Sequence, residues 1–304
     1  MGGGTTFIGG YNFVNTPSYY EEAATGYATA ISTAAASGVF GKVSDISVEV
    51  DPGTNEFRSL ASEDVYTQVV GQIGVRGRIT FALVDLSSTF INYSIKANAN
   101  ASGDISRPIH IVWAQRAVTA AASTPVTTYF ALRGCRTNNT TISASPGGHI
   151  TAECEFFAHS IVFTTVSGTY NSTYVTEPTT PIWNYEDGGA NPVTLNSRNY
   201  DTTDLSVSVG RNIKEVYVLG TSYVALQGPT IREITADGTF VYLTGSTQLD
   251  VEAATSYTLS WVMKTGAGTL TVASCVPISW SLPQTVADET YERVSFRGGT
   301  VAAI

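Results

Sequence analysis

An internal repeat is the feature that most constrains how this chain can fold. When residues 45–81 are placed beside residues 204–240, ten positions are identical without a gap. Chance agreement at this composition is roughly two or three positions. The matched residues in the first segment are Asp45, Ser47, Val48, Val50, Glu56, Leu60, Val65, Gln68, Thr80 and Phe81. The sequence therefore predicts two similar structural units in tandem.

The repeated segments have the alternating pattern of half-buried strands. Residues 45–50 place Ile46, Val48 and Val50 on one face, and residues 78–84 alternate in the same way. Similar short runs, bounded by Gly, Asn, Asp and Pro, recur along the chain, whereas helical spacing is clear only just after Asp85. We expect a mainly β protein, made of two antiparallel β-barrel or sandwich units with at most one short helix each.

Changes in composition suggest where these units begin and end. Residues 21–36 lack an apolar stripe, which favours an extended arm over a weak helix, and residues 1–36 are expected to form an N-terminal arm. Residues 177–200 are rich in Pro and Gly, without periodicity, and predict a linker. The first β unit is then expected over residues 37–176 and the second over residues 201–304.

The charge balance argues against several classes of protein. The formal net charge is −9, and only 13% of the residues are charged. The 16 Lys and Arg residues form no basic stripe, so a protein that grips nucleic acid is not expected. No apolar run reaches the ~18 residues that a membrane span needs, and the first residues do not resemble a signal peptide. These observations favour assembly inside a cell, away from membranes.

Motifs for catalysis or metal binding are weak. His149, Cys154 and His159 are evenly spaced, but on one strand Cys154 would point to the face opposite the two histidines. The nucleophile motif G-x-S-x-G does not occur. We therefore predict no enzymatic activity, no catalytic residues, no metal and no cofactor.

Two segments of the chain resemble a known family. Residues 204–220 and 133–145, together with the order of acidic turn, strand, polar excursion and strand in each unit, resemble the tail tube proteins of tailed viruses. The resemblance covers most of residues 40–304. It implies a virion structural protein whose stacked rings form a tube that conducts the DNA genome during ejection, without catalytic residues.

The resemblance also implies partners and a location. By similarity to doubled relatives, three chains would form a pseudo-hexameric ring, and rings would stack into a tube. The other partners would be the tape-measure protein, further tail proteins and genomic DNA passing through the lumen without specific binding. The protein would be assembled in the host cytoplasm and located in the virion tail.

Two groups of residues are candidates for assembly contacts. Cations beside the repeated strands and one linker tryptophan are expected at contacts between subunits, although solvated charge and core packing are the alternatives. These residues are Arg76, Arg78, Arg211, Lys214 and Trp183. A cluster of carboxylates is expected to face the lumen or the next ring. It comprises Glu49, Asp51, Glu56, Glu63 and Asp64.

Two other functions remain open on sequence grounds. An extracellular adhesin or carbohydrate-binding β-sandwich would also be rich in Ser, Thr and aromatic residues. Another ring of the same tail, such as a hub or terminator, would have the same strand pattern. Self-association and copy number per virion distinguish these functions from a tail tube.

Overall fold

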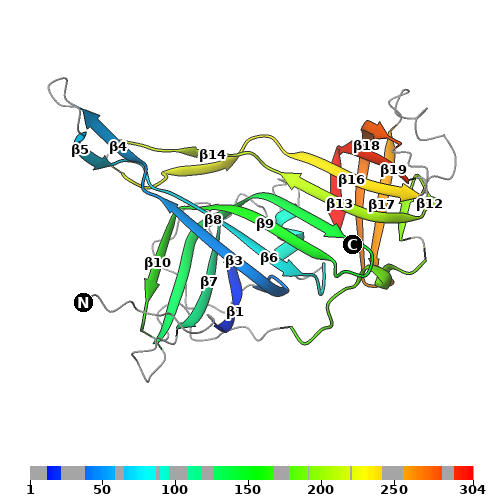
Figure 1. The fold of residues 1–304 in the computed structure, drawn as a ribbon, viewed down its shortest axis with the longest axis horizontal. Helices are drawn as coiled ribbons and strands as arrows, with labels where there is room; N and C mark the ends of the chain where they lie inside the picture. The colour runs from blue at the N-terminus through cyan, green and yellow to red at the C-terminus, as the bar shows by residue number, and fades with distance from the viewer. Residues whose placement is uncertain are drawn as a thin grey trace, which may run out of the picture.

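Antiparallel strands form nearly all of the regular structure in the computed structural model (Figure 1). The prediction of a mainly β fold is confirmed. The structure describes residues 12–21, 38–58, 65–86, 90–95, 108–117, 126–166, 178–190, 192–219, 221–241, 256–282 and 291–303.

The strands fall into two groups, which we call the first unit and the second unit. The first unit contains β1 (Asn12–Glu21), β2 (Gly38–Val39), β3 (Lys42–Asp51), β4 (Thr54–Arg58), β5 (Val65–Val70), β6 (Gly74–Ala82), α1 (Phe90–Ile95), β7 (Ile109–Ala117), β8 (Val126–Ala144), β9 (Thr151–Ala158) and β10 (Ser160–Thr164). The 3-10 helix η1 (Tyr185–Gly188) follows. The second unit contains β11 (Val193–Leu195), β12 (Arg198–Tyr200), β13 (Thr202–Gly210), β14 (Ile213–Val216), β15 (Leu226–Pro229), β16 (Glu233–Val241), β17 (Tyr257–Lys264), β18 (Gly268–Ser281), β19 (Tyr291–Gly298) and β20 (Thr300–Ala303).

One long sheet runs through both units. Its strand order is β3-β6-β9-β8-β13-β16-β19-β18, all antiparallel, and we call it the spanning sheet. Each unit adds an outer sheet, with the order β10-β8-β7-β1-β2 in the first and β20-β18-β17-β11-β12 in the second. Figure 1 shows β10, β7 and β1 below the strands of the first unit, and β12 and β17 at the right end of the molecule. Each unit is thus a two-layered β structure.

Strands β8 and β18 each take part in two sheets. The first part of β8 pairs with β7 and β10, and its later part pairs with β9 and β13. Gly134, at the change of partner, has a φ of 62°, and Ser274 in β18 has a φ of 54°. A left-handed residue bends a strand locally, so both long strands turn from one layer into the other at matching places.

The core lies between the layers of each unit. The helical spacing after Asp85 produces α1, and its Phe90 ring lies 4.6 Å from the ring of Phe40. Phe90 and Tyr93 are buried, and α1 also contacts β20 of the second unit. Since α1 has six residues, no helix among the described segments is long enough to cross a membrane.

The sequence repeat is also a repeat of strand register. In the first unit Val43 is opposite Phe81 and, after a bulge, Asp45 is opposite Thr80. In the second unit Thr202 is opposite Phe240 and, after a bulge at the same place, Asp204 is opposite Thr239. Adding 159 to each number of the first pairing gives the second.

A different shift relates the later strands. In the first unit Thr137 is opposite Phe156 and, after a bulge, Asn139 is opposite Glu155. In the second unit the corresponding pairs are Pro277 with Phe296 and Ser279 with Ser295. Here adding 140 converts one pairing into the other. The agreement in register and in bulge position supports the duplication predicted from sequence.

The predicted boundaries need correction at two places. Residues 12–21, expected in an arm, form β1, which pairs with β7 in the outer sheet of the first unit. Residues 193–200, expected in the linker, form β11 and β12, which occupy the matching place beside β17. In both cases a pairing with a strand distant in sequence overrides the local composition. The rest of the domain division stays a prediction.

Candidate assembly surfaces

The two faces of the spanning sheet differ in polarity. One face is buried against the outer sheets and carries side chains such as Ile79, Val207 and Phe296, all at most 1% exposed. The opposite face carries hydroxyl and charged side chains that are half-buried or exposed. This polar face extends over both units, because the strands alternate in phase across the sheet.

Both signs of charge occur on the polar face. The carboxylates include Asp45, Glu49, Asp51, Glu153, Glu155, Asp204, Glu233 and Asp237, and the cations include Lys42, Arg76, Arg78, Arg293 and Arg297. Arg78 Nη1 lies 3.4 Å from Glu153 Oε1, and Arg297 pairs with Glu233. The guanidinium carbon of Arg76 lies 5.1 Å from the centre of the Phe157 ring. The charges are therefore partly matched within the chain, with carboxylates in excess.

Two hollows lie along this face. One, of about 510 Å³, is lined by residues that include Glu49, Arg76 and Glu155. The other, of about 400 Å³, is lined by residues that include Asp204, Asp237 and Arg293. Hydroxyl and charged side chains from neighbouring strands line both hollows.

The candidate metal ligands have separate partners. His149 Nδ1 lies 2.7 Å from Asn184 Oδ1, His159 Nδ1 lies 2.7 Å from the carbonyl of Val224, and the Cys154 thiol donates to Thr140 Oγ1 at 3.5 Å. Burial raises the pKa of Cys154 to about 12. Over the described part of the chain, no group of three His, Cys, Asp or Glu side chains is placed to share a metal ion.

Inside the spanning sheet, the two units are joined by the pairing of one strand from each unit. Residues 139–144 of β8 pair with residues 205–210 of β13, and we call this the internal junction. On the polar face, the Thr141 and Ser208 hydroxyls are 2.9 Å apart, and Ser208 donates to Asn139 Oδ1 at 3.0 Å. The junction continues past β13, where Arg211 N donates to the Asn138 carbonyl at 2.8 Å.

Among the strands that the structure describes, the outer edges of the spanning sheet have no such neighbour. Within the described residues, β3 pairs only with β6, and residues 276–281 of β18 pair only with β19. Apolar side chains are exposed at both edges: Val50 is 46% exposed and Ile278 is 57% exposed. An open edge with exposed apolar groups is a template for pairing with another chain.

Two further hairpins extend from the spanning sheet, formed by β4 and β5 and by β14 and β15. Figure 1 shows β4 and β5 projecting from one end of the body. The second hairpin instead lies on the first unit, where the Ser222 carbonyl accepts from Ile73 N at 2.7 Å. The two hairpins share their register after the shift of 159, since Glu56 is opposite Gln68 and Glu215 is opposite Gln227.

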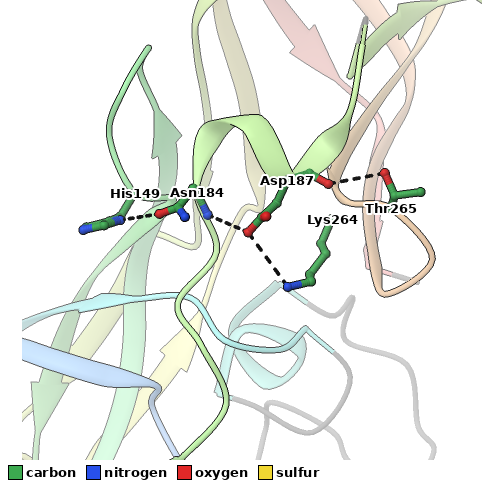
Figure 2. Close-up of polar contacts among 5 residues, drawn as sticks. All are labelled: His149, Asn184, Asp187, Lys264 and Thr265. Atoms are coloured by element: carbon green, nitrogen blue, oxygen red, sulfur yellow. Dashed lines mark hydrogen bonds and ion pairs between the residues drawn. The ribbon is translucent and has the colours of Figure 1, made fainter.

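The segment between the units is held by polar contacts from both sides (Figure 2). Asn184, which contacts His149 of the first unit, donates its backbone N–H to Asp187 Oδ2 at 2.9 Å. On the other side, Lys264 Nζ lies 3.9 Å from the same carboxylate, and Thr265 N donates to the Asp187 carbonyl at 3.0 Å. We call residues 183–189 the clasp, because they connect the units through specific bonds.

Three predicted contact cations are at the surface and two predicted residues are not. Arg76, Arg78 and Lys214 are exposed. Arg211 is 2% exposed, and its guanidinium donates to the Ser94 carbonyl at the end of α1. Trp183 is also 2% exposed, and its backbone pairs with Leu83 and Ile150. For Arg211 and Trp183 a contact between subunits is therefore corrected to a contact within the chain.

The predicted acidic cluster is only partly described. Glu49 and Asp51 lie exposed at the end of β3, and Asp51 Oδ1 accepts from Gly53 N at 2.9 Å. Glu56 lies in β4, but its side chain, and the whole of Glu63 and Asp64, lie outside the described residues. The orientation of the cluster toward a lumen or a ring stays a prediction.

Sequence reasoning missed a second arginine at the end of α1. The Arg232 guanidinium donates to the Ile95 carbonyl, beside the contact of Arg211 with Ser94. Burial lowers the pKa of Arg232. Both arginines come from the second unit and satisfy carbonyls that a helix end leaves without partners. No signal in the sequence indicates this contact, because Arg232 directly precedes Glu233 and Arg211 lies three residues before Lys214, as solvated charges would.

A comparison with protein families decides the relationship. A family model described as phage tail tube protein matches residues 95–298, more than half of the chain. The chain belongs to the phage tail tube protein family. The predicted family is thereby confirmed, and the protein is a structural component of a viral tail. No curated protein matches the chain. As a tail tube protein it belongs to a family that is generally structural, in keeping with the polar face and open edges.

Proposed function

We propose that this tail tube protein forms rings that stack into the tube through which the viral DNA leaves. The observation that carries the proposal is the spanning sheet, which has one polar face and two open edges. Pairing of the edges between chains removes the open edges and closes a wall of strands. Three chains, each with two units, would make a ring of six units. The protein acts by assembly and not by catalysis.

The polar face is suited to line the bore. Carboxylates outnumber cations on it, and the whole chain has a formal charge of −9. A wall with this balance does not hold phosphates, so DNA slides past it without specific binding. The exposed carboxylates Glu49 and Asp51 are then at the junction between neighbouring chains, with Arg76 and Arg78 on the strand beside them.

Stacking of the rings and contacts with the tape-measure and other tail proteins belong to the same proposal. We place the stacking contacts in the N-terminal segment and in the projecting hairpin of β4 and β5. The hairpin of β14 and β15 rests on the first unit of its own chain, which favours a lateral role for it. Assembly takes place in the host cytoplasm, and the mature location is the virion tail.

Negative-stain electron microscopy of the purified protein over a concentration series tests the proposal. We expect rings or hollow tubes of regular repeat, with six density lobes from three chains. Monomers at every concentration and salt would overturn the proposal, and binding to a glycan array would then favour the carbohydrate-binding alternative. Six chains in a ring of twelve lobes would overturn the stoichiometry but not the tube.

A further inference from the structure

We propose that β18 of one chain pairs with β3 of the next copy in one defined register, with Ser279 opposite Asp51, Trp280 opposite Val50 and Ser281 opposite Glu49. The inference rests on the proposed function, because it names the contact that joins neighbours in the ring. It assigns the two outer edges of the spanning sheet, β3 and β18, to contacts between copies and names the residues that lie opposite each other there. The occupant of each edge is a second copy of the same chain.

The internal junction is the template for this contact. Residue pairs Asn139–Gly210, Thr140–Val209 and Thr141–Ser208 lie opposite each other in antiparallel strands. At the junction β8, the last strand that the first unit contributes to the spanning sheet, pairs with β13, the first strand that the second unit contributes. If the sheet continues from one chain into the next copy, β18 of the first chain takes the place of β8, and β3 of the next copy takes the place of β13.

The two register shifts convert the template into a prediction. Strand β13 corresponds to β3 with a shift of 159, so Ser208, Val209 and Gly210 correspond to Glu49, Val50 and Asp51. The later part of β8 corresponds to β18 with a shift of 140, so Asn139, Thr140 and Thr141 correspond to Ser279, Trp280 and Ser281. In both correspondences the matching strands also share the position of a bulge, at Val43/Asp45 and Thr202/Asp204 in one and at Thr137/Asn139 and Pro277/Ser279 in the other. The shared bulges fix the alignment of the two units to a single residue.

Exposure at corresponding positions shows that β3 lacks the cover that β13 has. Val209 is 1% exposed and Val50 is 46% exposed, although they occupy the same place in their units. On the other edge, Thr140 is 1% exposed and the corresponding Trp280 is half-buried. The proposed register brings Trp280 and Val50 together and removes both from water, as a cross-strand pair of aromatic and β-branched residues.

The polar pairs are also compatible in charge. At the internal junction the Thr141 and Ser208 hydroxyls lie 2.9 Å apart. In the proposed contact a serine hydroxyl faces a carboxylate at both polar positions, so each serine can donate to an acceptor with full charge. No like charges lie directly opposite. This head-to-tail contact uses two different surfaces and closes into a ring when its rotation allows.

Cysteine cross-linking between separately tagged chains tests the register. One chain carries Glu49→Cys and the other carries Ser281→Cys, so only a contact between chains forms the disulfide. The displaced control replaces Glu49→Cys with Ser47→Cys, two residues along the same face. The native Cys135, Cys154 and Cys275 are buried, which keeps them from competing. The internal positive control is the double variant Thr141→Cys and Ser208→Cys in one chain.

We expect the matched pair to give at least about ten times as much covalent dimer as the displaced pair, since disulfide formation depends steeply on distance. Ring formation by each variant is checked by electron microscopy under reducing conditions. An equal or larger yield from the displaced pair overturns the register. Rings without cross-linking of the matched pair, while the internal control cross-links, overturn the inference and leave the proposed function standing. Absence of rings from the unmutated chain overturns both.

Discussion

Strands β3 and β13 correspond in sequence, in register and in the position of a bulge, but they differ in exposure. Val209 in β13 is buried between two neighbouring strands, whereas Val50 at the same place in β3 is 46% exposed. The two strands have the same alternating pattern. The comparison teaches that here the neighbour, and not the pattern of the strand itself, determines whether a position belongs to a core or to an open edge.

A lysine at each of these two positions should give the largest contrast. Val209→Lys places a charge without a partner in the core and should cost at least about 3–5 kcal/mol of the free energy of unfolding. Val50→Lys should change the free energy of the single chain by less than about 0.5 kcal/mol but prevent rings, because an edge lysine blocks strand pairing. Urea unfolding of dilute protein and electron microscopy measure the two effects. Equal losses of stability would contradict the comparison.

The clasp should be nearly as sensitive. Trp183→Ala removes a buried ring that lies against Gly268, where even an added methyl carbon would come within 2.3 Å of the ring. We expect a loss of about 3–5 kcal/mol in thermal or urea unfolding. The control is Trp280→Ala at the open edge, which removes a half-buried ring and the indole N–H that donates to Glu292 Oε2 at 3.1 Å; it should cost about 1–3 kcal/mol in the single chain and reduce ring formation. A stable Trp183→Ala chain would show that the clasp does not hold the units.

The buried arginine at α1 should have an intermediate effect. Arg211→Met leaves the Ser94 carbonyl without its charged donor and should cost about 1.5–3 kcal/mol. Arg76→Met is the control on the polar face, where loss of the contact with Phe157 should cost about 0.5–1 kcal/mol. Urea unfolding of both variants measures the difference. If Arg76→Met cost more, the assignment of Arg211 to an internal contact would be wrong.

The smallest effect is expected for charge pairs on the polar face. Arg78 and Glu153 are 50% and 43% exposed, so a double-mutant cycle with alanine should give a coupling of only about 0.2–1 kcal/mol. The corresponding positions in the second unit are Asp237 and Arg293, with the signs exchanged. A cycle there should give a coupling of similar size, reduced by salt. A coupling above about 2 kcal/mol in either unit would mean that this face is not open to solvent.

The sequence predicts the fold well where the spacing of the repeat is constant. Asp45 and Thr80 correspond to Asp204 and Thr239 with the same shift of 159, so a comparison without gaps detects both matches. The later strands do not align at the same shift, because the segment between β16 and β19 is shorter than the segment between β6 and β9, and the shift falls to 140. Trp113 and Trp261 occupy matching places, opposite Phe130 and Leu270, but no single shift of the sequence connects all these pairs.

The candidate contact residues show the limit of local reasoning. Arg76 and Arg78 lie two residues apart on one strand, so the two-residue alternation of a half-buried strand is enough to predict that both are exposed. Arg211 and Trp183 lie in segments without periodicity, and their burial depends on α1 and β18, which are distant in sequence. Likewise, nothing in residues 12–21 indicates β7 as a partner. Contacts between distant segments decide these positions, and one sequence does not specify them.

The bend at Gly134 in β8 has a mechanical consequence. Because one continuous strand serves both layers of the first unit, a force that slides one layer past the other pulls along the covalent backbone and not only on hydrogen bonds. Strand β18 does the same in the second unit, with its bend at Ser274. Each unit therefore resists shear as a single body, and the strand pairings between bodies are where a loaded assembly yields first.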